Sequence, residues 1–187
     1  MNMALKSMRP ALVAFVALTA LCGGLYTAGV TGIAQAFFPE KANGSILTVT
    51  ARDGTKRNVG SALIAQDFSK PEYLIGRPLG TTNLSPDSEK QRALVQERIA
   101  RWHALDPANA ADIPMDLVTA SGSGVDPNVS PEAAEYQVGR IALERGLSAE
   151  KVREVIAKYT KGRFLGIFGE PSVNVLEVNL ALDGLSW

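Results

Sequence analysis

The chain has 187 residues, with 19 basic and 19 acidic side chains and one histidine, so its formal net charge at pH 7 is zero. When Lys6 and Arg9 are set aside, 17 basic residues remain against 19 acidic ones, a net charge of −2. This balance argues against nucleic-acid binding, which needs a basic excess on one face. The one cysteine, Cys22, excludes a disulfide bond within the chain.

An uncharged run dominates the amino-terminal part. Residues 11–38 are 28 consecutive residues without Asp, Glu, Lys, Arg or His. As a helix this run would be about 42 Å long, more than the roughly 30 Å of a hydrocarbon core, so we predict a transmembrane helix over 11–38. Basic residues stand before the run, whereas Glu40 and Lys41 after it cancel. The positive-inside rule then predicts cytoplasmic residues 1–10 and an extracytoplasmic domain over 43–187.

Two other fates of this segment are compatible with short motifs. Ala34-Gln35-Ala36 resembles a signal-peptidase site, but the apolar part of a signal peptide is only about 7–15 residues long. Cys22 suggests a lipoprotein signal, but bulky Leu21 stands where a small residue is required. We therefore favour a span that is retained in the mature protein.

Small residues recur every fourth position in the outer half of the span. This spacing lets the backbones of two membrane helices approach closely, which favours a docking face for a membrane partner; chance enrichment of Gly and Ala is the alternative. The residues are Ala20, Gly24, Ala28, Gly32 and Ala36.

The remaining chain is long enough to bury a core and mixes strand and helix patterns. We predict a hairpin from β-branched residues 46–50, a turn at 52–55 and a return strand at 56–63. The segment Asp53-Gly54-Thr55-Lys56 resembles a phosphate-binding or phosphorylation motif, but the predicted turn accounts for these residues. Residues 66–86, rich in Pro and Gly, are predicted to be irregular.

A helix is predicted over 88–105, because Leu94, Val95, Ile99 and Trp102 form one apolar stripe. A short buried strand is predicted over 115–120.

Two capped helices and a strand are predicted to follow. Ser130 and Pro131 begin the first helix and Gly146 ends it, and Ser148 caps the second, which runs to about residue 160. A long strand is predicted over 173–182, with a β-bulge or burial on both faces where the apolar phase slips. This mixture, without strict βαβ alternation, predicts one α+β domain.

Enzymatic and metal sites find little support. His103 is far in sequence from the Gly-Ser loop, and Ser121-Gly122-Ser123-Gly124 lacks the spacing of a Gly-x-Ser-x-Gly elbow. A membrane-anchored periplasmic serine hydrolase is therefore the alternative rather than the preferred function. With one histidine and no cysteine outside the span, no metal site is expected.

The Gly-Ser loop permits two interpretations. Its backbone amides at the start of a capped helix could bind an anion such as a nucleotide phosphate, although neither G-x-x-x-x-G-K-[ST] nor G-x-G-x-x-G is present. Alternatively, the loop is structural, with Asp126 or Ser130 satisfying its amides. We favour the structural interpretation for Ser121, Gly122, Ser123, Gly124 and Asp126.

Gln137 is unusual because it lies in the apolar stripe of its helix with Ala134, Val138 and Ile141. A buried amide without partners costs about 1–3 kcal/mol, so it must find some. We expect Gln137 to hold the Gly-Ser loop; contact with a ligand or a partner subunit is the alternative.

Long collinear blocks resemble the C subunit (KdpC) of the bacterial Kdp potassium-transporting P-type ATPase, from about Arg9 to Asp183. The family usually carries a longer insert where this chain has only Leu79-Gly80-Thr81-Thr82. The matching blocks are residues 9–11, 60–66 with 76–78, 114–127 with 130–137, and 169–182.

The resemblance implies a non-catalytic accessory subunit of an inner-membrane K⁺ import complex. Its implied partners are a channel-like, K⁺-selecting subunit and an ATP-hydrolysing subunit, which it assembles and whose ATP affinity it raises as a catalytic chaperone. It implies no cofactor of its own, but a nucleotide contact at Gln137. The predicted topology places Gln137 outside the cell, where ATP is scarce, so an effect on ATP affinity would have to travel through the complex.

Overall fold

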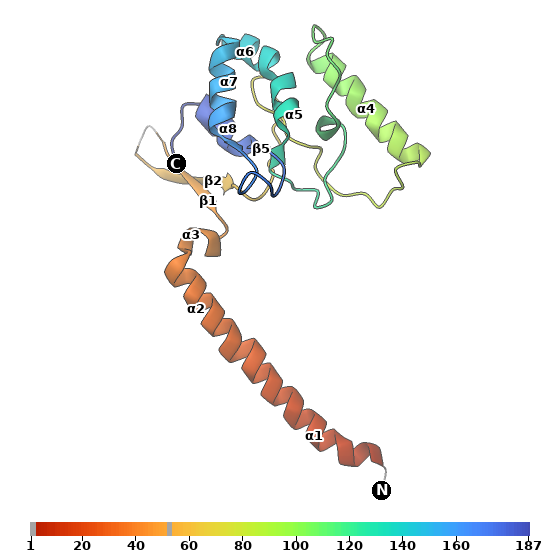
Figure 1. Ribbon diagram of the computed structural model, residues 1–187, viewed down its shortest axis with the longest axis vertical. Coiled ribbons are helices and arrows are strands. Elements are labelled where there is room, and N and C mark those ends of the chain that lie inside the picture. The colour runs from red at the N-terminus through yellow and green to blue at the C-terminus, as the bar shows by residue number, and fades with distance from the viewer. Residues whose placement is uncertain (1–2, 52–53) are drawn as a thin grey trace. The chain divides into compact units, whose positions relative to one another are not determined.

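The computed structural model describes residues 3–51 and 54–187, and the chain divides into two compact units at Ser45. The first unit is an almost continuous helix followed by a short one (Figure 1). It comprises α1 (Met3–Leu18), a π-helical segment η1 (Thr19–Tyr26), α2 (Thr27–Phe37) and α3 (Pro39–Ala42). Over Ser7–Phe37 it is long and apolar enough to cross a membrane, and an 18-residue stretch within it has a mean hydropathy of 1.9.

The π-helical segment affects the alignment of the small residues. A four-residue step overshoots one turn of an α-helix but falls short of the wider turn of a π-helix. The step from Ala20 to Gly24 lies within η1, whereas the steps from Ala28 to Ala36 lie within α2. Successive small residues therefore rotate around the helix axis in one direction within η1 and in the opposite direction within α2. The stripe as a whole stays closer to one face than it would in a uniform α-helix.

The second unit begins with an antiparallel hairpin of β1 (Ile46–Thr50) and β2 (Lys56–Ser61). Arg52 and Asp53 of the predicted turn lie outside the described residues. The register shifts after Leu47, which makes Val59 an extra residue in β2. The chain from 62 to 88 has no helix or strand, as predicted for 66–86, and leads into α4 (Glu89–Leu105). Ser88 caps this helix by accepting from the Gln91 amide at 3.2 Å.

The predicted strand over 115–120 is wrong. A 3₁₀ turn, η2 (Met115–Leu117), occupies this region, because the Thr119 hydroxyl donates to the Met115 carbonyl at 2.8 Å and closes the turn. Only Leu117 and Val118 are buried here, and Met115 is exposed. The Trp102 indole donates to the Leu117 carbonyl at 3.0 Å and joins α4 to this turn.

The helix predicted from Ser130 to Gly146 is interrupted. The structure has α5 (Pro131–Tyr136) and α6 (Val138–Arg145), with Gln137 between them. Ser130 caps α5, and Gly146 ends α6 in the left-handed region, as predicted. The next helix, α7 (Ala149–Lys158), is capped by Ser148, which also agrees with the prediction.

The long strand predicted over 173–182 is also wrong. A strand, β5 (Ser172–Asn174), passes directly into a helix, α8 (Val175–Leu182). The Asn174 side chain accepts from the Glu177 amide at 3.1 Å and caps the helix. The slip of the apolar phase between Val175 and Leu176 is therefore a change from strand to helix rather than a β-bulge.

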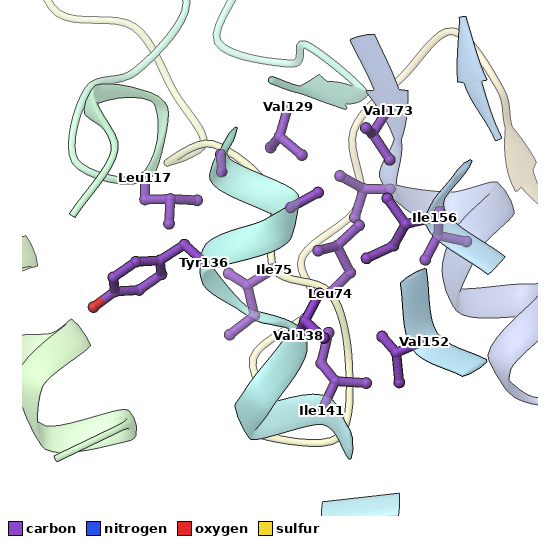
Figure 2. Close-up of a cluster of buried hydrophobic side chains, with 14 of the residues drawn as sticks. Leu74, Ile75, Leu117, Val129, Tyr136, Val138, Ile141, Val152, Ile156 and Val173 are labelled. Carbon is purple, nitrogen blue, oxygen red and sulfur yellow. The ribbon is translucent and has the colours of Figure 1, made fainter. Parts of the chain in front are cut away.

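A small antiparallel sheet and five helices, α4 to α8, enclose the core of this domain. The sheet has the order β3-β5-β4, with β3 (Asn128–Val129) and β4 (Thr160–Lys161) on either side of β5. The irregular chain before α4 contributes Leu74 and Ile75 to the core, beside Val138, Ile141 and Val152 (Figure 2). The predicted α+β class is confirmed, together with one amino-terminal helix that is long and apolar enough to span a membrane.

Candidate functional site

Gln137 lies at the break between α5 and α6, with φ −94° and ψ −9°, and is completely buried. Its amide oxygen accepts from the Ile75 N–H at 2.8 Å. Its amide nitrogen donates to the Ile75 carbonyl at 3.0 Å and to the Ala133 carbonyl at 3.1 Å. Gln137 therefore holds the irregular segment around residue 75 and not the Gly-Ser loop, which corrects our expectation.

A second buried amide repeats this arrangement one residue earlier in the segment. Asn179 of α8 accepts from the Leu74 N–H and donates to the Leu74 carbonyl, both at 2.8 Å. Two side-chain amides thus satisfy the backbone of consecutive residues that belong to no helix or strand, as buried polar groups require. We missed Asn179 as a site residue; the signal was an amide between the core residues Val178 and Leu180.

Arg140 is a third buried polar side chain that holds the same irregular segment, and with Gln137 and Asn179 it forms a cluster. Its guanidinium donates to the Gln137 amide oxygen at 2.6 Å, to the Tyr73 carbonyl at 3.1 Å and to the Pro71 carbonyl. Only 4% of the residue is exposed, and among the described residues no carboxylate forms an ion pair with it. Burial lowers the pKa of Arg140 to about 10, opposed by the charge of Asp106. The side chain also stacks 5.8 Å from the Trp102 ring centre.

A cleft of about 870 Å³ lies beside this cluster. Tyr136, Arg140 and acidic residues including Asp106, Asp112 and Glu135 line it, but Gln137 does not. The buried Tyr136 hydroxyl has no hydrogen-bond partner among the described residues. Its ring extends toward α4 (Figure 2). There it meets the Trp102 ring edge to face, with ring centres 5.8 Å apart. Burial and the charge of Asp106 raise the pKa of Tyr136.

Tyr136→Phe is expected to leave the free energy of unfolding unchanged or to raise it by up to about 1 kcal/mol, because it removes a buried hydroxyl that makes no bond and keeps the ring. Urea denaturation followed by tryptophan fluorescence measures the change. A loss of more than about 1 kcal/mol would show that the hydroxyl has a stabilising partner.

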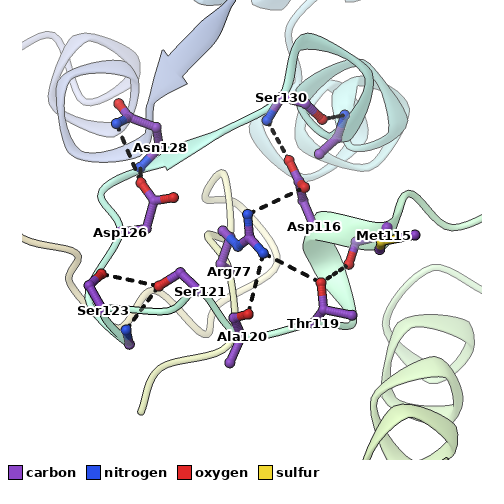
Figure 3. Close-up of polar contacts among 12 residues, drawn as sticks. Arg77, Met115, Asp116, Thr119, Ala120, Ser121, Ser123, Asp126, Asn128 and Ser130 are labelled. Atoms are coloured by element: carbon purple, nitrogen blue, oxygen red, sulfur yellow. Dashed lines mark hydrogen bonds and ion pairs between the residues drawn. The ribbon is translucent and has the colours of Figure 1, made fainter. Parts of the chain in front are cut away.

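The Gly-Ser loop satisfies its own polar groups. Ser121 accepts from the Gly124 N–H at 2.9 Å, Ser123 accepts from the Val125 N–H at 3.2 Å, and the two hydroxyls are 3.2 Å apart (Figure 3). Asp126 accepts from the Asn128 N–H at 3.0 Å. The acceptors for the Gly124 and Val125 amides are therefore Ser121 and Ser123; of the two acceptors that we expected, Asp126 serves the Asn128 amide and Ser130 the start of α5.

Arg77 connects this loop to the preceding 3₁₀ turn. Its guanidinium lies 3.6 Å from an Asp116 carboxylate oxygen and donates, at 3.4 Å each, to Thr119 and to the Ala120 carbonyl (Figure 3). The other oxygen of Asp116 accepts from the Ser130 N–H at 2.7 Å, at the start of α5. The cluster fixes the start of α5, and with it the position of Gln137.

The structure does not assemble the alternative serine hydrolase. His103 is exposed near the end of α4, and no hydrogen bond joins it to a serine in the described part of the chain. Ser123 is engaged within its own loop. The described residues also hold no group of three or more His, Cys, Asp or Glu side chains suited to a metal ion.

The small residues of the span leave open surface. A Cβ added at Gly24 or Gly32 would meet no atom within 4 Å, whereas one at Gly23 would meet only a Thr19 methyl at 4.0 Å. Larger side chains at these positions therefore fit within the chain itself.

Comparison with known proteins gives one consistent result. A family model described as "KdpC: K+-transporting ATPase, c chain" matches residues 8–184. The chain is 58% identical over 180 residues to a potassium-transporting ATPase KdpC subunit of Listeria monocytogenes, which covers 95% of both chains. It is 48% identical over 200 residues to a KdpC subunit of Clostridium perfringens (97% and 98% covered). It is 47% identical over 192 residues to one of Sorangium cellulosum (96% and 98%).

Proposed function

The chain belongs to the KdpC family of K⁺-transporting ATPase subunits, and from this premise we propose that it is a non-catalytic accessory subunit that assembles a K⁺ import complex. The observation that carries the proposal is the family match over almost the whole chain, from residue 8 to residue 184. The proposed partners are a channel-like, K⁺-selecting subunit and a subunit that hydrolyses ATP.

We infer a single-pass protein of the cell inner membrane, with residues 1–10 in the cytoplasm and the domain from residue 43 in the periplasm. Lys6 and Arg9 before the span support this orientation. The length of the apolar helix supports a retained anchor rather than a cleaved signal peptide.

The small-residue stripe is the proposed docking face within the membrane. Close backbone approach along Gly24 and Gly32 would give packing and weak hydrogen bonds that bulky lipid-facing residues prevent. The open space at both glycines supports this, because nothing in the chain itself requires their small size.

An effect on ATP affinity would act through the complex. The amide of Gln137 is fully engaged with Ile75, Ala133 and Arg140, which favours a structural role over direct contact with a nucleotide. In this proposal the soluble domain binds two conformations of the pump with different affinities and so shifts the equilibrium between them.

The double variant Gly24→Leu, Gly32→Leu is expected to lower the amount of partner subunits that co-purify with the tagged chain by at least about tenfold, or about 1.4 kcal/mol of association free energy. The measurement is quantitative pull-down from solubilised membranes, with the bands identified by mass spectrometry. Gly23→Leu, one residue off the stripe, is the matched control and should co-purify normally. Stoichiometric partners on the double variant would contradict docking through the stripe.

A further inference from the structure

The loop between β4 and β5 exposes an unusual number of large apolar side chains. Every residue from 161 to 170 is exposed. Four large apolar residues in this loop, all within five consecutive positions, are each between 63% and 74% exposed. They are Phe164, Leu165, Ile167 and Phe168. Such clusters on soluble surfaces mark binding sites.

The loop forms a tight turn that its own backbone hydrogen bonds close. Phe164 and Phe168 exchange backbone hydrogen bonds of 2.8 Å and 2.9 Å, which form a small antiparallel bridge. At the tip, Leu165 has φ +52° and Gly166 has φ +74°. A positive φ disfavours leucine, and asparagine or glycine would fit this backbone better. Leucine at the exposed tip therefore serves something other than the fold of the turn.

Cationic and aromatic groups surround the base of the loop. Arg163 pairs with Glu170 at 2.8 Å, and Lys161 forms no ion pair within the described part of the chain. Tyr159, just before β4, stacks on Trp187 with ring centres 5.4 Å apart, and Lys158 lies over the Tyr159 ring. Tyrosine and tryptophan favour the membrane–water interface, and lysine and arginine favour anionic headgroups.

The attachment of the domain keeps this loop within reach of a bilayer. The domain begins at Ile46, eight residues after Phe38, and eight fully extended residues span at most about 28 Å. Within the domain, the blue loop between β4 and β5 lies on the same side as the start of β1 (Figure 1). The loop and the point at which the tether joins the domain therefore lie on one side of the domain (Figure 1).

We propose that the loop 162–171 is a membrane-interface anchor, which inserts Phe164, Leu165, Ile167 and Phe168 into the leaflet that the soluble domain faces. The inference rests on the proposed retained span but requires no partner subunit. It gives the domain a second attachment to the bilayer, and two attachments fix an orientation that one flexible tether does not.

The test uses the full chain with Cys22→Ser and Ile167→Cys, labelled with a polarity-sensitive dye and reconstituted alone in phosphatidylethanolamine–phosphatidylglycerol vesicles. The dye emission is expected to shift to the blue, and nitroxide-labelled acyl chains are expected to quench it at least about twofold more than a dye at Ala93→Cys on exposed α4. Adding Leu165→Asn and Phe168→Ser should return the dye to water, which excludes insertion driven by the dye.

The other outcomes overturn the inference in distinguishable ways. The dye could report water with the chain alone but a blue-shifted emission, without quenching by the acyl-chain nitroxides, in the assembled complex. This result would show that the loop docks on a partner protein. A dye in water in both samples would show that the loop binds neither. Vesicle flotation is measured in parallel. A chain that fails to float would overturn the retained anchor itself, whereas a floating chain with a dye in water would overturn only the role of the loop.

Discussion

Gln137→Leu is expected to lower the free energy of unfolding of the soluble domain by about 3–5 kcal/mol. Leucine keeps the approximate volume but removes both polar ends of the amide. The N–H and C=O of Ile75 are left without their partners in the core, and Arg140 loses an acceptor at 2.6 Å. Each buried polar group without a partner costs about 1–3 kcal/mol, and the guanidinium costs more because it is charged.

Denaturation by urea, followed by the fluorescence of Trp102 and Trp187, measures this change in the full chain in detergent. Gln96→Leu is the matched control, because Gln96 is an exposed glutamine on α4, and its effect should stay within about 0.5 kcal/mol. Equal effects of the two substitutions would contradict the structural role of Gln137.

Gln137→Glu separates the hydrogen bonds that the Gln137 side chain accepts from those that it donates. A carboxylate still accepts from Ile75 and from Arg140, but it cannot donate to the Ile75 and Ala133 carbonyls. We therefore expect a loss smaller than that of Gln137→Leu, because the buried guanidinium gains a charge partner. If nucleotide affinity is measured in these variants, a loss that follows stability across the series indicates an effect of folding rather than of contact.

Helices with clear capping residues or a clear apolar stripe were predicted well from the sequence, because these signals are local. Ser88, Ser130 and Ser148 each cap the helix that was predicted to begin there, and the apolar stripe of 88–105 forms α4. The amino-terminal helix, which is long and apolar enough to cross a membrane, follows from composition alone, because 28 consecutive residues carry no charge. In these segments the signal lies within a few neighbouring residues.

The two wrong strand predictions share a cause, because composition does not show which side chain will close a turn or cap a helix. Residues 115–120 and 173–182 have strand-like composition, but a Thr119 side chain closes a turn in one, and Asn174 begins a helix in the other. A short apolar run has the same pattern in a buried strand and in a segment of a buried helix. Only the packing around β5 and α8 decides between them.

The candidate site was found only in part, because its hydrogen-bond partners are far apart in the sequence. The position of Gln137 in an apolar stripe predicted a buried amide, which is confirmed. Its partner, Ile75, is 62 residues away in a segment without regular structure, so no local pattern could identify it. Asn179 and Arg140 were missed because a lone amide or arginine on an amphipathic helix is usually solvated, and their buried partners lie in that same distant segment.

Gly124→Ala is the second substitution with a large expected effect, a loss of about 2–3 kcal/mol in the free energy of unfolding. Gly124 has φ +70°, which any other residue adopts at a cost of about 1–2 kcal/mol. An added Cβ would also lie 2.7 Å from the Gly80 carbonyl carbon and 3.0 Å from its Cα. Because these atoms are backbone, the segment 79–82 would have to move as a whole, and the Gly80 N–H would lose its 2.9 Å bond to the Gly124 carbonyl.

Gly122→Ala is the matched control in the same loop. Its Cβ would meet nothing within 4 Å, and Gly122 has no positive φ, so its effect should stay within about 0.5 kcal/mol. Urea denaturation measures both variants, and limited proteolysis at residues 79–82 reports whether the segment has detached. A Gly124→Ala protein as stable as Gly122→Ala would contradict the close approach of the two loops. Unchanged proteolysis with lowered stability would assign the loss to backbone strain at Gly124 alone, because a displaced segment would expose new cleavage sites.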